Sequence, residues 1–463
     1  MDGDVRTNPY LDGNFAPVRS EDDFDLEITG EIPAGLRGAL YRIGPNPQFE
    51  PRDPNHHWFT GDGMIHGFHV ADGKVAYRNR YVRTPRWREE AAAGRSLFGS
   101  FGNPMTTDPS VLGHENGVAN TAILMHAGKL MALEEGHGPF QVDPDTLDSL
   151  GYLEPYAGRV TAHPKVDPVT GEMIWFGYGV GQMPLGAGMS YGVTDAAGRV
   201  VRRDDFDAPF ASMVHDFMVT ENHVLFPILP LTASLARAMS GRPAFAWEPD
   251  KGAHVGVMRR DGEVSSIRCF NAPACYVFHP MNAWEEGTKL FADVMRYDVA
   301  PLFPNPDGSA GERSAARLVR WTLDLAGDSD AIAETALDDL DGEFPRFDER
   351  FATRPYRHGW FAADPTGRKT IKQTAIAHLD LQTGARQVWQ LNGGDMTSEP
   401  VFTPRAPDAP EGDGWITAVI WRAAENRSDM VVLDALDVAK GPIAVAKLPR
   451  RVPFGFHGTF VAA

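Results

Sequence analysis

The sequence predicts an all-β fold, a seven-bladed β-propeller in which loops and short helices cap the face that would carry an active site. Glycine and proline, 47 and 36 of 463 residues, are spread along the whole chain and separate many short segments. Between them, alternating apolar residues are joined by turns rich in Asp, Gly or Asn, which is typical of hairpins. At about 40 to 60 residues per blade, this length favours about seven blades over two sandwiches.

Five hairpins are marked by their turns. Each joins two alternating runs through residues that favour tight turns. They cover 68–82 with Asp72 and Gly73 at the turn, 140–153 with Pro144 and Asp145, 254–270 with Asp261 and Gly262, 375–391 with Thr383 and Gly384, and 430–448 with Lys440 and Gly441. The recurrence of one unit without an exact sequence repeat fits a set of blades.

Two segments carry helix signals. Residues 84–98 begin with Thr84 as an expected N-cap and Pro85 at the first helical position, and residues 232–241 run from Thr232 to a terminating Gly241. Both are short, so we expect them to decorate a sheet protein.

The last segment, RVPFGFHGTFVAA at 451–463, is apolar and aromatic although chain ends usually fray. Pairing of this segment with an N-terminal strand would close a propeller ring and order the chain end. We therefore expect residues 1–463 to form a single domain that its N- and C-terminal strands close.

The composition excludes several classes of partner. With 62 acidic and 44 basic residues, a formal charge of −18, the chain would repel a phosphate backbone, so no nucleic acid is expected. Two cysteines and a start without a secretion signal indicate a reducing, cytoplasmic location. The apolar run at 224–231 is far shorter than the roughly 20 residues of a membrane span. Residues 227–241 allow a weak peripheral membrane contact, although packing on their own domain is favoured.

Four of the 15 histidines stand in or beside apolar, strand-like stretches. A buried imidazole without a partner costs on the order of 1 to 3 kcal/mol, and a backbone carbonyl could satisfy any single one. The four are separated by 52, 64 and 178 residues and so belong to different blades, whose inner strands converge on one axis. A metal on that axis explains all of them, with zinc, copper, iron and nickel left open. These histidines are His163, His215, His279 and His457.

Three glutamates have similar surroundings, namely Glu135, Glu343 and Glu399. Each is interpreted as the acceptor for the second N–H of a ligand histidine. The alternatives are exposed charges at strand ends, or a propeller glycosidase that uses Glu343 and Glu399 as its paired acids.

Along essentially its whole length the chain resembles the carotenoid cleavage oxygenase family, non-haem iron enzymes that include the isomerase of the retinal pigment epithelium. The resemblance is carried, in order, by YRIGPNPQF (41–49), FTGDGMIHGF (59–68), VANTAILMHAGKLMALEEG (118–136), TAHPKVDP, VHDFMVTENHVLF, FHPMNAWEEG, GEFPRF, TSEPVF and FHGTF.

The resemblance implies one ferrous ion, Fe(II), per chain, held by the four histidines, with the three glutamates behind them and Thr121 beside the open side of the metal. It implies dioxygenase cleavage of a conjugated C=C bond of a small hydrophobic alkene by O2, giving two carbonyl products. The alternatives are an isomerase on the same iron centre and a propeller that only binds partners.

The resemblance also assigns Phe59, Phe101 and Glu134 to the substrate pocket. Relatives that cleave hydroxystilbenes typically carry a lysine and a tyrosine where this chain has Glu134 and Phe101. A carboxylate cannot stabilise a phenolate, so an apocarotenoid-like polyene is the expected substrate and a stilbene or phenylpropenoid the alternative. Compact length and the stretch 402–415 resemble the stilbene-cleaving branch and favour that alternative.

Overall fold

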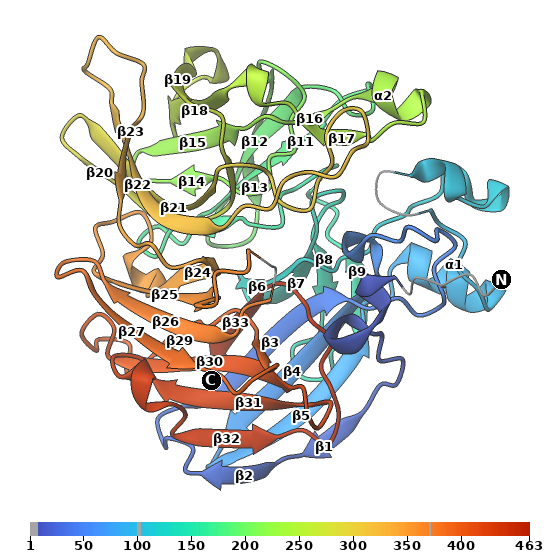
Figure 1. Ribbon diagram of the computed structural model, residues 1–463, viewed down its shortest axis with the longest axis vertical. Helices are drawn as coiled ribbons and strands as arrows, with labels where there is room; N and C mark the ends of the chain where they lie inside the picture. Colours follow the sequence, from blue (N-terminus) through green and yellow to red (C-terminus); the bar gives the residue numbers. More distant parts are fainter. Residues whose placement is uncertain (1–7, 100–102, 157, 370–371) are drawn as a thin grey trace.

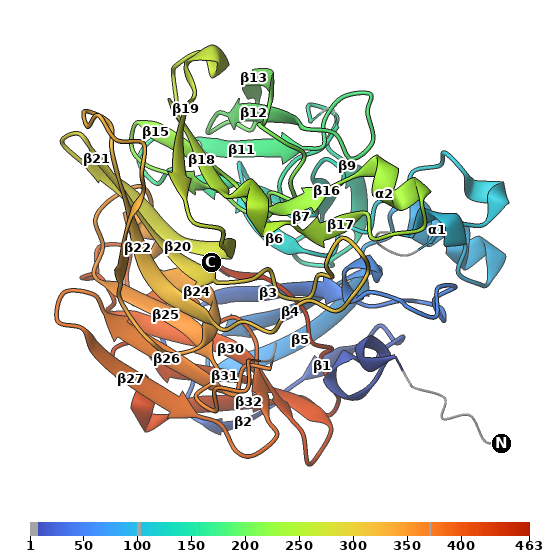
Figure 2. The ribbon, with the colours of Figure 1, turned by 45° about the horizontal axis from the view of Figure 1, so that its top comes forward.

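The computed structural model describes residues 8–99, 103–156, 158–369 and 372–463. Its strands form seven sheets of four or more strands around one axis, as Figure 1 shows, and one additional two-stranded sheet. In the tilted view of Figure 2 the colours again pass around the ring in chain order. The predicted seven-bladed β-propeller is confirmed.

The blades differ little in construction, since neighbouring strands pair antiparallel throughout. The blade that contains both chain ends has β1 (Asp23–Asp25), β5 (Lys74–Tyr81), β4 (Gly63–Ala71), β3 (Gly38–Pro45) and β33 (Gly458–Ala462). The second blade has β6 (Ala122–His126), β7 (Lys129–Leu133), β8 (Phe140–Val142) and β9 (Ser149–Tyr152). The third blade has β10 (Lys165–Val166), β11 (Met173–Tyr178), β12 (Gly188–Thr194) and β13 (Val200–Asp207). The fourth blade has β14 (Met218–Val219), β15 (His223–Ile228), β18 (Ala253–Arg259) and β19 (Arg268–Ala272).

The last three blades complete the ring. They have β20 (Tyr276–Glu286), β21 (Lys289–Tyr297), β22 (Ala316–Asp324) and β23 (Ala333–Ala336); β24 (Gly342–Phe347), β25 (His358–Ala363), β26 (Ala375–Asp380) and β27 (Ala385–Gln390); and β2 (Glu27–Gly30), β32 (Ala444–Lys447), β31 (Arg427–Asp434) and β30 (Gly414–Arg422), with β28 (Met396–Thr397) and β29 (Val401–Pro404) both on β30. The small additional sheet pairs β16 (Leu231–Ala233) with β17 (Phe245–Trp247).

All five predicted hairpins are confirmed, as the pairs β4–β5, β8–β9, β18–β19, β26–β27 and β31–β32. At the first of them Asp72 and Gly73 both have positive φ, 51° and 73°, which a tight hairpin turn requires.

Both helix predictions need a correction. Helix α1 (Pro85–Ala93) begins, as predicted, after Thr84, whose side chain accepts a hydrogen bond from the backbone N–H of Trp87, but it ends five residues before the predicted Phe98, where Gly94 has a left-handed φ of 66°. Helix α2 (Leu235–Met239) begins after Ser234, so the predicted start at Thr232 is wrong. Thr232 lies in β16, because its backbone pairs with Ala246 of β17.

Strands from the two chain ends share two blades. β33 pairs with β3, and β2 pairs with β32. The blue and red strands accordingly lie side by side in Figure 1. These pairings order the C-terminal segment and support the single-domain interpretation of residues 1–463, which stays a prediction.

One edge strand of most blades faces the axis. Strands β6, β33, β29, β24, β20 and β14 contact one another in that order. The apolar core lies between neighbouring blades, where Trp175, Trp321 and Trp360 are fully buried. Side chains on or beside the inner edge strands therefore converge from separate blades.

The C-terminal segment approaches β3 too closely for any side chain at Gly44, where an added Cβ would lie 2.4 Å from the Cα of Gly455. We expect Gly44→Ala to lower the free energy of unfolding by about 1 to 3 kcal/mol, because backbone must move. Chemical denaturation measures this. Gly393→Ala is the control, because Gly393 is exposed with open space around its Cα, and an equal loss in both variants would contradict the prediction.

No helix within the described residues is long and apolar enough to cross a membrane. Residues 227–232 are buried, in agreement with the favoured packing on their own domain, and the weak peripheral membrane contact stays an untested alternative.

Candidate metal centre

The four predicted histidines meet on the propeller axis. One ring nitrogen of each lies within 4.8 Å of the others, and the cluster is the one such group of potential metal ligands within the described residues. His163, His215 and His457 stand at the ends of segments that lead into β10, β14 and β33, and His279 lies in β20. Each therefore comes from a different blade.

The spacing of the imidazoles fits a bound metal ion. The Nε2 atom of His215 lies 3.0 Å from Nε2 of His163 and 3.1 Å from Nε2 of His279. Metal–nitrogen bonds of about 2.1 Å separate two ligands by about 3.0 Å at right angles and by about 3.4 Å at tetrahedral angles. Both separations are close to the right-angled value, as is expected where neighbouring imidazoles share one metal ion.

The protonation of the imidazoles also fits metal binding. Burial and the neighbouring imidazoles hold the pKa of His163 well below its usual range, and burial lowers the pKa of His457 to about 4 although Glu399 opposes this. Neutral rings of this kind can coordinate a cation. For His279, burial lowers the pKa, but the carboxylate of Glu343 outweighs it and raises the pKa overall.

Each of the three predicted glutamates contacts one histidine at Nδ1. Glu135 contacts His215, Glu343 Oε2 lies 2.5 Å from His279, and Glu399 Oε1 lies 2.9 Å from His457. A carboxylate at Nδ1 keeps the proton on that nitrogen and leaves Nε2 to face the axis. Because Glu343 and Glu399 are each occupied by an imidazole, they do not form the free acid pair of a glycosidase.

Local irregularities of the strands aim these side chains inward. The pairing of β20 with β21 shifts register at Pro280, next to His279, and the pairing of β24 with β25 shifts register after Glu343. Phe344, at the second shift, has a positive φ of 54°. Bulges of this kind bend a strand and redirect its side chains.

Several residues that hold the glutamates were missed by the sequence analysis. The hydroxyl of Tyr178 donates to Glu135, and the guanidinium of Arg346 lies 3.3 Å from Glu399 Oε2. Burial disfavours a charge on Glu399, but Arg346 and His457 together lower its pKa to about 2. Arg346 follows Glu343 by three residues in GEFPRF, but nothing in the sequence relates it to Glu399, 53 residues later.

A cavity of about 530 Å³ opens beside the imidazoles. Its wall contains His215, His279 and His457, together with Thr121, Phe59 and Glu134 from the sequence analysis. Aromatic side chains cover much of the remainder, namely Trp58, Phe278, Phe344, Phe454 and Phe456. Phe101 lies outside the described residues.

Glu134 belongs to a charged group in the wall of this cavity. Its Oε1 accepts a hydrogen bond from the backbone N–H of Val118 at 2.8 Å and lies 2.8 Å from Nδ1 of His137. The Nε2 atom of His137 lies 2.5 Å from Glu115. Burial opposes the charge on His137, but the two carboxylates raise its pKa to about 10, so it is an imidazolium at neutral pH.

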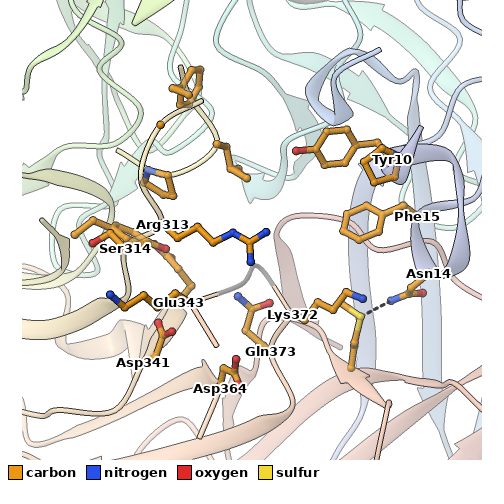
Figure 3. Close-up of a pocket in the computed structure, with 18 of the residues that line it drawn as sticks. Tyr10, Asn14, Phe15, Arg313, Ser314, Asp341, Glu343, Asp364, Lys372 and Gln373 are labelled. Carbon is orange, nitrogen blue, oxygen red and sulfur yellow. Dashed lines mark hydrogen bonds between the residues drawn. The ribbon is translucent and has the colours of Figure 1, made fainter. Parts of the chain in front are cut away.

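A second cavity of about 720 Å³ borders the first and shares Tyr297, Glu343 and Gln373 with it. Figure 3 shows the side chain of Arg313 extending into this space from one side and Tyr10 on another. The second cavity has none of the four imidazoles in its wall, whereas the first has three, so the first cavity is the better fit for an alkene that must lie beside the metal.

Comparisons with known proteins agree with this geometry. The sequence profile of the family described as retinal pigment epithelial membrane protein matches residues 15–462. An isoeugenol monooxygenase of Pseudomonas nitroreducens is 40% identical, over 98% of each chain. The structure of Pseudomonas brassicacearum lignostilbene dioxygenase superposes with a TM-score of 0.94 at 36% identity, over 98% of this chain and 99% of that one. A variant of Synechocystis apocarotenoid oxygenase has a TM-score of 0.87 at 28% identity, over 96% and 97%.

These relatives correct the expected order of substrates. The proteins named for isoeugenol and lignostilbene are more similar to this chain than the one named for an apocarotenoid. They favour the stilbene and phenylpropenoid alternative over the apocarotenoid that the sequence analysis ranks first. The expected order took the charge of Glu134 without His137, which follows it by three residues, and without Glu115, which contacts His137 in the fold.

Proposed function

The chain belongs to the carotenoid cleavage oxygenase family, also described as the retinal pigment epithelial membrane protein family, and from this premise we propose that it holds one ferrous ion and cleaves a phenylpropenoid or stilbene double bond with O2. It is an alkene-cleaving oxygenase. The observation that carries the proposal is the cluster of four imidazoles, three of which line a cavity that also has several aromatic side chains in its wall.

The residues proposed to bind the ion are His163, His215, His279 and His457. A bound ferrous ion would supply the capture and activation of O2. In the balanced reaction one C=C bond and one O2 become two carbonyl groups, so no external reductant is needed when both oxygen atoms enter products. The protein itself would orient the alkene and exclude water.

We assign Thr121 to the wall that limits the open side of the metal. Its hydroxyl donates to Asn120 Oδ1 at 2.9 Å, and its carbonyl accepts from the backbone N–H of His457 at 3.2 Å. With its proton engaged by Asn120, Thr121 acts through shape and position and not as an acid. Phe59, half-buried in the same wall, is assigned to stacking against the substrate ring.

Glu134 is assigned to accepting a hydrogen bond from a hydroxyl of the substrate. His137 and Val118 occupy its Oε1 and fix the carboxylate in the cavity wall. An ionised carboxylate accepts from a neutral phenol and repels a phenolate, so the substrate would bind un-ionised.

Glu134→Leu is expected to raise KM for a 4-hydroxylated substrate about tenfold or more, since hydrogen bonds to charged groups contribute about 1.5 to 3 kcal/mol. The kcat is expected to change little, because the reacting bond is elsewhere. Steady-state kinetics with the 4-hydroxy and 4-methoxy forms of one substrate measures both constants. Glu134→Gln keeps an acceptor oxygen and is the matched variant, in which a smaller rise of KM is expected. Equal effects of Glu134→Leu on the two substrates would exclude this role.

The reaction itself is tested with a panel of isoeugenol, a hydroxystilbene and an apocarotenal under ¹⁸O-labelled O2, with products identified by mass spectrometry. We expect labelled aromatic aldehydes from the first two. Cleavage of the apocarotenal alone would restore the apocarotenoid interpretation. Isomerised, unlabelled product would favour an isomerase, and the absence of any reaction by the iron-loaded protein would favour a propeller that only binds partners.

A further inference from the structure

The four imidazoles of the cluster differ in what contacts their outer nitrogen. Three have a glutamate at Nδ1 within hydrogen-bonding distance, as described above. The fourth, His163, has Oδ2 of Asp216 at 3.7 Å from its Nδ1, which is beyond a hydrogen bond. The cluster therefore contains one histidine whose neighbouring carboxylate does not hydrogen-bond to it.

Asp216 is held in that position by other donors. Lys165 Nζ lies 2.7 Å from Oδ1 and 3.0 Å from Oδ2, and the backbone N–H of Phe217 donates to Oδ1 at 2.6 Å. The side chain of Asp216 is 3% exposed and that of Lys165 29%, so the pair is largely withdrawn from solvent. A buried carboxylate bound in this way has little freedom to turn toward His163.

The sequence places the pair beside two ligands at once. Lys165 follows His163 by two residues, and Asp216 directly follows His215. The ion pair thus connects the first residue of β10 with the segment before β14, next to two neighbouring imidazoles of the cluster.

We propose that Lys165 keeps Asp216 out of hydrogen-bonding reach of His163, so that His163 is the weakest donor of the four histidines to the bound metal. A carboxylate that accepts the Nδ1 proton makes the opposite nitrogen a stronger donor, and His163 lacks this help. Lys165 and Asp216 are positioning residues in this scheme, since neither reaches the axis. The inference rests on the proposed function only in requiring that the cluster binds a metal.

The first test compares Asp216→Asn with Glu399→Gln in protein loaded with Co(II), by following the loss of metal to a chelator. Asp216→Asn is expected to change the rate by less than about threefold, whereas Glu399→Gln is expected to raise it about 10 to 100-fold. Comparable acceleration in both variants would overturn the proposal, because Asp216 would then support a ligand as the glutamates do.

The second test releases Asp216 by Lys165→Met. We expect Asp216 to close on His163, which slows the loss of Co(II) about tenfold and shifts its visible absorption bands. Lys165→Arg keeps the charge and is expected to match the wild type, and Lys165→Met with Asp216→Asn is expected to return to it. Wild-type rate and bands in Lys165→Met would overturn the proposal.

Folding of Lys165→Met is checked by circular dichroism. Should the unpaired buried Asp216 prevent folding, the comparison of Asp216→Asn with Glu399→Gln still decides the proposal. Failure of the wild-type protein to bind Co(II) or iron would contradict the proposed function instead, so the two failures are distinguishable.

Discussion

Replacing His279 with alanine is expected to abolish alkene cleavage and to reduce bound iron well below one ion per chain. The imidazole of His279 is one of four that meet within 4.8 Å, and its Nε2 lies 3.1 Å from that of His215. Loss of one nitrogen donor also leaves Glu343 buried without its imidazole partner. Iron content is measured by elemental analysis, and activity by aldehyde formation from the preferred alkene.

The variant is expected to stay folded, because it leaves the large buried side chains between the blades, such as Trp321 and Trp360, in place. His114→Ala is the matched control, since His114 is 49% exposed and contacts only Glu89 among the described acids. Normal iron content and activity in His279→Ala, with His114→Ala unchanged, would rule out the metal centre as assigned.

Glu399→Gln is expected to weaken metal retention about 10 to 100-fold while leaving measurable activity at saturating iron. Glutamine can still contact His457, but it brings no negative charge to offset the metal. The charge also matters to Arg346, which lies 3.3 Å from Glu399 and would lose one of its two carboxylate partners. The rate of iron loss to a chelator measures the effect.

The control for this variant is Glu349→Gln. Glu349 is the other carboxylate on Arg346, at 2.5 Å, and is 60% exposed. Glu349→Gln removes one carboxylate partner of Arg346 without changing a contact to an imidazole, and metal retention in this variant is expected to be unchanged. Equal iron loss in the two variants would show that the effect comes from the lost partner of Arg346, and not from the lost contact between the carboxylate of Glu399 and His457.

The fold and the four-histidine cluster could be predicted because they depend on patterns that are visible in the sequence alone. Hairpin turns such as Asp72–Gly73 are local, because the backbone conformation is set by the turn residues themselves. The histidines were recognisable because polar residues in apolar strands require a partner. The start of α2 was misplaced at Thr232 because pairing with Ala246 of β17, a tertiary contact, prevails over the local capping signal.

The partners of the site could not be predicted in the same way. Arg346 reaches Glu399 across 53 residues of sequence, and Tyr178 reaches Glu135 across 43. The position of Asp216 depends on Lys165, 51 residues away. Such contacts carry no periodicity or spacing, since each depends on how two blades are placed beside each other.

By itself, the sequence predicted a propeller and singled out four histidines and three glutamates, because strand alternation, turn chemistry and polar residues in apolar surroundings are local features; the resemblance to a known family then assigned the seven residues to one site. Only the tertiary structure decided which carboxylate contacts which imidazole, that Glu115 contacts His137, and that Asp216 is 3.7 Å from His163. The physical reason is that hydrogen bonding and charge interactions act over a few ångströms, and the packing of segments that are far apart in the chain sets those distances.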